Sequence, residues 1–158
     1  GWVKNDHYKS SGELVHLLVN IVAKGGNLLL GIGPNGKGEF EPKVYENLEM
    51  LGRWLDLNGE AIYSTHPVEP YSEGQVAYTA KDDRTIYAIY LPTKDEKELP
   101  AQITVRTKLT GKLKASLVST HQKLNIQTIN GGINISIPKN LRAALAKSEA
   151  TAIKITNN

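Results

Sequence analysis

The sequence predicts an α/β segment followed by an all-β domain: the closing segment of a (β/α)8 barrel, then an antiparallel β-sandwich. Three observations support this. Residues 28–32 form an apolar run without polar alternation, as in parallel strands that are covered on both faces. Segments with helical spacing flank this run, and short runs rich in Val, Ile, Thr and Tyr follow from about residue 67. The expected domains are therefore residues 1–66 and 67–158.

A first helix is predicted to begin at about Ser11. Ser10 and Glu13 have the spacing of a capping box, in which each side chain bonds the other residue's backbone N–H. Helical spacing then places apolar side chains on a broad stripe, which indicates tight packing against a sheet: Leu14, Leu17, Leu18, Ile21 and Val22. Gly25 and Gly26 are expected to end the helix.

The apolar run 28–32 is predicted to be a buried strand, and a turn-rich loop over 33–38 follows it. Pro42 suits the first turn of a second helix, which is expected to stop at Asn58-Gly59. The order helix, strand, loop, helix matches the closing quarter of a (β/α)8 barrel, and a doubly wound sheet gives the same local pattern. Because no second strand of this kind is evident, the parallel neighbours are expected outside this chain, and the first 60 or so residues are expected to be ordered only against them.

Residues 65–70 are interpreted as a connector. Seven short runs beyond it are predicted strands that form a compact antiparallel sandwich: 75–80, 85–91, 102–107, 113–119, 124–129, 133–138 and 150–155. Turn signals such as Asn130-Gly131-Gly132 separate them, and residues 141–147 are expected to add a helical turn.

Composition bears on partners and cofactors. The 158 residues carry 19 Lys and Arg against 16 Asp and Glu, without a basic block, which argues against a nucleic-acid partner. No apolar run is long enough to span a membrane, so no membrane partner is expected. Cysteine is absent, and no histidine pair has metal-ligand spacing on one helix. We therefore expect no metal and no cofactor.

Few residues are candidates for chemistry. The loop 31–38 has neither the Walker nor the dinucleotide-binding spacing, although a nucleotide-binding α/β protein stays an alternative. His7 is the one histidine considered for ligand contact. Glu39 and Glu41 follow the loop, but acidic residues before a helix also favour its positive end. Trp2 and Tyr8 are either a sugar platform or an apolar anchor. No persuasive pair of catalytic carboxylates is evident.

Two long motifs resemble the α-L-fucosidases of glycoside hydrolase family 29. The first, SSGELVHLLVNIVAKGGNLLLGIGP, covers residues 10–34, and the second, GRWLDLNGEAIY, covers residues 52–63. The resemblance extends over about the first 66 residues, and the later strands resemble that family's carboxy-terminal β-sandwich in architecture only. The sequence departs from the family at Gly31, where an Asn is common, and at Val3-Lys4, where Gly-Tyr is usual.

The resemblance implies a retaining enzyme that removes terminal α-L-fucose from glycans. The family's nucleophile Asp and acid/base Glu belong to barrel segments upstream of these motifs, so no catalytic residue is assigned and the fragment alone is expected to be inactive. Trp2 matches a family tryptophan near the sugar and is the one residue carried over as a substrate contact. The implied partners are a fucosylated glycan and the missing N-terminal barrel portion, and the implied locations are secreted, periplasmic or lysosomal. A non-catalytic carbohydrate-binding or structural sandwich is the rival interpretation.

Overall fold

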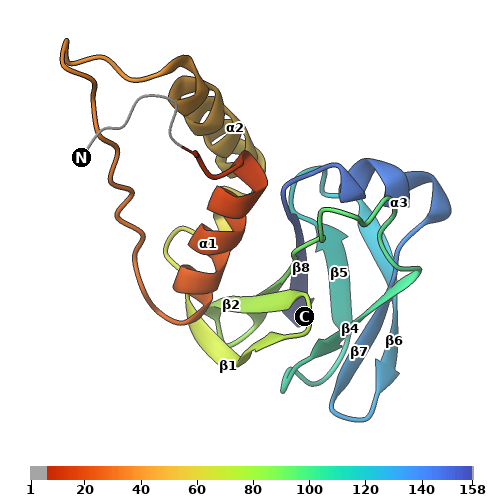
Figure 1. The fold of residues 1–158 in the computed structure, drawn as a ribbon. Helices are drawn as coiled ribbons and strands as arrows, with labels where there is room; N and C mark the ends of the chain where they lie inside the picture. The colour runs from red at the N-terminus through yellow and green to blue at the C-terminus, as the bar shows by residue number, and fades with distance from the viewer. Residues whose placement is uncertain (1–6, 158) are drawn as a thin grey trace.

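Two parallel helices lie against one face of an antiparallel sheet in the computed structural model, which describes residues 7–157 (Figure 1). The helices are α1 (Ser11–Ala23) and α2 (Pro42–Asn58), and a short 3-10 turn, η1 (Gly59–Ala61), follows α2. The Asn47 side chain of α2 donates a hydrogen bond of 2.7 Å to the Lys9 carbonyl. The helices therefore begin at the same end of the molecule.

The predicted start and end of α1 are confirmed. The Ser10 N–H donates to the Glu13 carboxylate at 2.9 Å, and the Glu13 N–H donates to the Ser10 hydroxyl at 3.3 Å. The bond from the Ser10 N–H and a bond of 2.8 Å from the Ser10 hydroxyl to the same carboxylate, with the charge of Lys94, lower the pKa of Glu13 to about 2. At the other end Gly25 takes a φ of 83°, and the Gly26 N–H bonds the Ile21 carbonyl at 2.9 Å. This is the glycine-dependent closure that the sequence predicts.

The predicted strand over residues 28–32 is not formed in this structure. The segment between α1 and α2 has no strand partner and runs apart from both helices (Figure 1), and Leu29 is 95% exposed. A strand needs a neighbour for its backbone N–H and C=O groups. The described residues place no strand beside this segment. The prediction of helix, strand, helix is therefore corrected to helix, unpaired segment, helix.

The rest of the chain forms one antiparallel sheet of eight strands in the order β1-β2-β3-β8-β5-β6-β7-β4. All seven predicted strands are confirmed, and the missed strand is β1, in the stretch interpreted as a connector. Helix α3 (Lys139–Ala146) confirms the predicted helical turn. The strand bounds are β1 His66–Glu73, β2 Val76–Asp82, β3 Thr85–Tyr90, β4 Gln102–Arg106, β5 Leu113–Leu117, β6 Lys123–Ile129, β7 Gly132–Ser136 and β8 Thr151–Asn157.

The expected sandwich is a single sheet that folds over and nearly closes on itself. Strands β5 and β6 share only the pairs Ala115↔Leu124 and Ser116↔Lys123, so the sheet bends sharply there. Its two halves then enclose one core, to which almost every strand contributes. Members of this core include Tyr78, Ile103, Leu117, Ile135 and Ile153. The antiparallel all-β prediction is confirmed, while the two separate sheets of a sandwich are replaced by one continuous sheet.

A second core lies on the outer face of β2, β3 and β8, where the helices pack. Val15 and Val19 of α1 and Tyr87 and Ile89 of β3 belong to it, together with Trp54 of α2. Because helices cover one face and the folded sheet covers the other, β2 and β3 are buried on both faces. The first 60 or so residues were expected to be ordered only against parallel neighbours outside this chain, but both helices pack on the sheet within it.

Polar contacts also join the helices to the sheet. The His16 Nε2–H donates to the Glu149 carbonyl at 2.8 Å, and the Trp54 Nε1–H donates to the Ala150 carbonyl at 2.9 Å. In the opposite direction, the Thr79 hydroxyl donates to the Ala61 carbonyl at 2.7 Å. These bonds satisfy groups that burial would otherwise leave unpaired. The helices are therefore fixed to the sheet in one register.

The Glu60 carboxylate adds an ionic contact at the same interface. It accepts hydrogen bonds from the Tyr87 hydroxyl at 2.9 Å and from Lys154. The bond from Lys154 lowers the pKa of Glu60 below its ordinary value of 4.5, although burial opposes this. A carboxylate with a lowered pKa stabilises the folded state above its unfolded pKa, and this stabilisation is lost as the pH falls.

We therefore expect Glu60→Gln to cost about 0.5–1 kcal/mol of unfolding free energy at pH 7, a magnitude suited to a half-exposed pair. The difference between variant and parent shrinks as the pH falls below 4.5 and protonates Glu60 in the parent. Urea unfolding at pH 7 and pH 3 measures it. Lys154→Gln should lower stability in the same pH range, and an equal Glu60→Gln effect at both pH values would contradict this role of the carboxylate.

Candidate functional site

The candidate substrate contact Trp2 lies outside the described residues. The loop 33–38, which the sequence also singles out, lies within the unpaired segment, and Asn35 organises it. The Asn35 carboxamide oxygen accepts from the N–H groups of Lys37 at 2.9 Å and Glu39 at 3.0 Å. Gly38 supports the turn with a φ of 82°. The loop therefore closes on itself, and Glu39 takes part in that closure.

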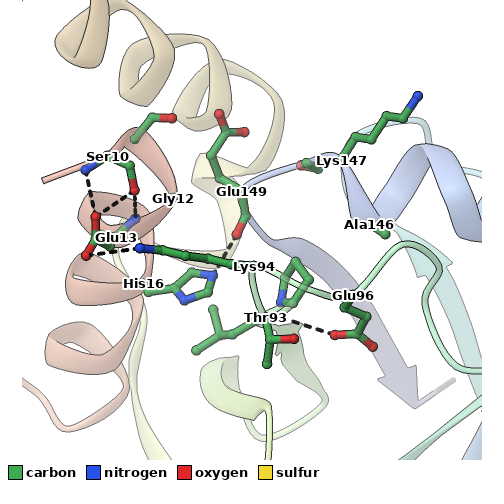
Figure 2. Close-up of a pocket in the computed structure, with 14 residues that line it drawn as sticks. Ser10, Gly12, Glu13, His16, Thr93, Lys94, Glu96, Ala146, Lys147 and Glu149 are labelled. Atoms are coloured by element: carbon green, nitrogen blue, oxygen red, sulfur yellow. Dashed lines mark hydrogen bonds and ion pairs between the residues drawn. The ribbon is translucent and has the colours of Figure 1, made fainter. Parts of the chain in front are cut away.

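A groove of about 460 Å³ opens where the amino-terminal end of α1 meets the sheet domain (Figure 2). One wall comes from the first turn of α1, which contributes Ser10, Gly12 and Glu13, and His16 lies one turn further along. The facing walls come from the loop after β3 and from the segment after α3. The groove thus joins three segments that are distant in the sequence.

Charged and polar groups dominate the groove. Lys94 reaches across it, and its Nζ lies 3.7 Å from the Glu13 carboxylate (Figure 2). The Glu96 carboxylate accepts from the Tyr90 hydroxyl at 2.6 Å and from the Gln75 amide at 2.8 Å. Burial raises the pKa of Glu96, but these two hydrogen bonds outweigh it and leave the pKa below its ordinary value. Glu13 and Glu96 are therefore held as carboxylates near neutral pH.

The same hydrogen bonds decide what these acids can do. Glu13 caps α1, Glu96 holds Tyr90 and Gln75, and Glu60 holds Tyr87 and Lys154. A general acid for glycoside hydrolysis needs a raised pKa, so that it is protonated at working pH. The pKa of each of these three carboxyls is lowered. The groove is thus suited to binding a polar molecule, and its Glu13 and Glu96 are unsuited to proton donation.

The structure does not gather the histidines into one site. His16 bonds the Glu149 carbonyl and lines the groove. His7 is exposed, and His121 lies at the turn between β5 and β6 with a φ of 58°. Across residues 7–157, no group of three or more His, Asp or Glu residues is placed to hold a metal ion.

The sequence did not predict the groove, because its contacts join residues far apart in the chain, such as Glu13 with Lys94 and His16 with Glu149. Only the capping box at Ser10 and Glu13 marked one wall in advance. In the described part of the chain, no helix combines the length and apolar character that a membrane span requires.

Comparison with known sequences identifies relatives along most of the chain. A family model described as alpha-L-fucosidase matches residues 1–60. Tissue alpha-L-fucosidase of Rattus norvegicus is 32% identical over 148 residues, which is 91% of this chain and 31% of the rat protein. The Homo sapiens tissue alpha-L-fucosidase is 34% identical over the same shares of each chain. The chain thus spans about a third of the length of these relatives.

Solved structures match both the helices and the sheet. The alpha-fucosidase of Thermotoga maritima, in complex with a mechanism-based inhibitor, superposes with a TM-score of 0.81 at 27% identity, over 99% of this chain and 37% of that one. Alpha-L-fucosidase isoenzyme 1 of Paenibacillus thiaminolyticus gives a TM-score of 0.78 at 29% identity, again over 99% and 37%. These relatives share both the sheet and the way in which α1 and α2 pack on it.

The relatives are glycoside hydrolases that act on fucosides, as their names state. Along most of its length, the chain corresponds to a carboxy-terminal portion of α-L-fucosidases.

Proposed function

We propose that this chain is the carboxy-terminal part of a retaining α-L-fucosidase that hydrolyses terminal α-L-fucose from glycans. Residues 1–66 supply the last two helices and the last strand of a (β/α)8 barrel, and residues 67–158 supply the sheet domain beside it. The nucleophile Asp and the acid/base Glu come from upstream barrel segments. Trp2 contacts the sugar. The family relationship supports the activity, and the form of the helical region supports the barrel.

The single observation that carries the barrel proposal is the second apolar face of α1. One face, with Val15 and Val19, is fully buried against the sheet. Leu17 and Ile21 lie on other sides of the same helix and are only half-buried. A helix that is apolar all round belongs between two layers. We infer that the outer face of the barrel strands is the layer that covers its second face.

The unpaired segment fits the same arrangement. It leaves the carboxy-terminal end of α1, returns to the amino-terminal end of α2, and carries its apolar run 28–32 along the way (Figure 1). A strand that runs opposite to its two flanking helices is the repeat unit of a (β/α)8 barrel. Leu29, which is 95% exposed here, would be covered once parallel neighbours pair with the run. The loop 33–38 would then lie at the barrel end where active sites form.

The proposal is tested by comparing the isolated chain with a chimera in which it replaces the matching portion of the Thermotoga maritima enzyme. We expect the chain alone to give no turnover of an aryl α-L-fucoside, because the proposed catalytic Asp and Glu lie upstream of it. The carboxylates of Glu13, Glu60 and Glu96 are engaged in structural hydrogen bonds. The chimera should hydrolyse the same substrate. Turnover by the isolated chain, or a folded chimera without activity, would overturn the proposal.

Within the chimera, Trp2→Ala is expected to raise KM about tenfold, since a stacked aromatic ring contributes on the order of 1 kcal/mol to sugar binding. Tyr63→Ala serves as the matched control, because Tyr63 is 61% exposed and has no role in the proposed site. Equal effects of the two substitutions would remove Trp2 from the site.

A further inference from the structure

Strand β1 contains a wide bulge that the proposed hydrolase activity does not explain. Pro67 pairs with Thr79 of β2, and the next pair is Ser72 with Ala77. Four residues of β1, 68–71, therefore stand opposite the single residue Tyr78. Bulges of this kind re-aim side chains and recur beside functional sites. Tyr71 is the last residue of this bulge.

Tyr71 is held in an unusual way for an aromatic residue. Its φ is 66°, in the left-handed region that bulky side chains rarely occupy, and its side chain is 43% exposed. Backbone strain of this kind persists where the surrounding structure enforces it, and it clusters at ligand-contacting positions. The structure thus presents a half-exposed aromatic side chain on a strained backbone position.

The ring borders a groove of about 400 Å³ along the seam between the edge strands β1 and β4. Side chains close this seam. Lys108 Nζ lies 2.9 Å from the Glu69 carboxylate, and Arg106 Nε lies 3.4 Å from that of Glu73. The Arg106 N–H also donates to the Tyr78 hydroxyl at 3.2 Å. Because these contacts occupy the two edges, the seam is a poor site for the addition of a peptide strand.

We propose that this groove binds a neutral sugar ring of a glycan, with the Tyr71 ring as its platform. A sugar ring presents an apolar CH face together with a rim of hydroxyls, and an aromatic side chain beside polar groups matches both. Pro67, Val68 and Leu109 supply apolar lining, and the remaining lining includes carboxylates and cations that can bond hydroxyls.

The charges of the groove argue against an anionic ligand. Lys108 and Arg106 pair with the carboxylates of Glu69 and Glu73, and Asp82 and Asp83 add further negative charge to the lining. The Glu69 carboxylate raises the pKa of Lys108, and Lys108 lowers that of Glu69, so this pair stays charged. With no excess of positive charge, the groove offers little to phosphate, sulfate or nucleic acid.

This groove is distinct from the groove in Figure 2. The turn after α1 approaches β1, because a Cβ built on Gly25 would lie 3.2 Å from the Pro67 side chain. The site therefore adjoins the carboxy-terminal end of α1, whose 13 residues span about 20 Å. The choice of a glycan as ligand rests on the proposed function, whereas the binding itself requires no hydrolysis.

Titration of the 15N-labelled 158-residue chain with lactose and with its α-1,2-fucosylated derivative tests the proposal by NMR. We expect saturable shifts of the backbone signals of Tyr71, Asp83 and Lys108 with both sugars, at millimolar affinity. Tyr71→Asn should weaken binding at least tenfold, because asparagine tolerates the left-handed backbone and removes the ring. Tyr71→Phe should keep binding within about twofold.

Tyr63→Ala is the control, since Tyr63 is more exposed than Tyr71 and lies outside the groove, and it should leave binding unchanged. Absence of saturable shifts with either sugar would overturn the proposal, as would equal binding by the Tyr71→Asn variant. If a sulfated oligosaccharide bound more strongly than lactose, the proposal that the ligand is neutral would be overturned. Lactose binding combined with an inactive chimera would retain this site and reject the proposed hydrolase function.

Discussion

Replacing Trp54 by alanine is expected to lower the free energy of unfolding by about 3–5 kcal/mol, the usual cost of truncating a buried large aromatic residue. Trp54 is 2% exposed, belongs to the core between the helices and the sheet, and bonds the Ala150 carbonyl. The truncation removes apolar contact with both layers. We therefore expect α1 and α2 to lose their hydrogen-exchange protection before the sheet does. Urea unfolding and amide exchange measure the two effects.

A second variant separates the contribution of the indole hydrogen bond to stability from the contribution of the ring's apolar contacts. Trp54→Phe keeps most of the apolar contact, and the Ala150 carbonyl still accepts from the Ser148 hydroxyl at 3.0 Å. This variant should therefore lose only about 1–2 kcal/mol. Leu57→Ala is the control on the same helix, because Leu57 is 57% exposed, and it should change stability by less than about 0.5 kcal/mol. Equal losses for Trp54→Ala and Leu57→Ala would contradict the role of Trp54 in fixing the helices.

The second large effect is expected at Gly132, in strand β7. A Cβ at this position would lie 2.1 Å from the Val105 carbonyl oxygen and 3.2 Å from the Arg106 Cα, so it would meet backbone that cannot rotate away. Gly132→Ala must therefore push β4 from β7. Because β7 is the one partner of β4 among the described strands, we expect a loss of about 3 kcal/mol or more in the free energy of unfolding, measured by thermal unfolding.

Gly52→Ala is the matched control for this substitution. Gly52 lies within α2, and nothing lies within 4 Å of a Cβ built there. Alanine in a helix interior is favoured over glycine by about 0.5–1 kcal/mol, so this variant should be more stable than the parent. A Gly132→Ala variant as stable as the Gly52→Ala variant would show that β4 does not approach Gly132 so closely.

The elements of the fold follow closely from local sequence signals. Ser10 with Glu13, Gly25, and Pro42 mark helix ends, because capping and helix termination depend on a few neighbouring residues. Alternation and turn residues likewise predict seven of the eight strands. Strand β1 is missed because it contains Pro67 and Pro70, and proline cannot donate to a strand ladder. It occupies an edge of the sheet, where this loss is tolerated.

What the local pattern cannot supply is the partner of each surface. The run 28–32 has the composition of a buried strand, yet strand formation depends on neighbours that the described residues do not provide. The sequence also does not identify β3 as the strand on which the helices pack. Tyr87 and Ile89 indicate a buried face of that strand, but they do not indicate what covers it. The groove at Glu13 and Lys94 depends on a contact across eighty residues. Trp2 lies outside the described residues, and its role stays a prediction.

The position of β8 in the sheet has a consequence for how the chain folds as it is made. Residues 151–157 are the last of the described strands to be synthesised, yet they pair with both β3 and β5 in the middle of the sheet. His16 and Trp54 bond the two residues immediately before this strand. Contacts of such long sequence separation slow folding, and the edges of β3 and β5 that pair with β8 stay unpaired until β8 is synthesised. Residues 7–157 must therefore all have emerged from the ribosome before β8 can complete the sheet and before His16 and Trp54 can form these hydrogen bonds.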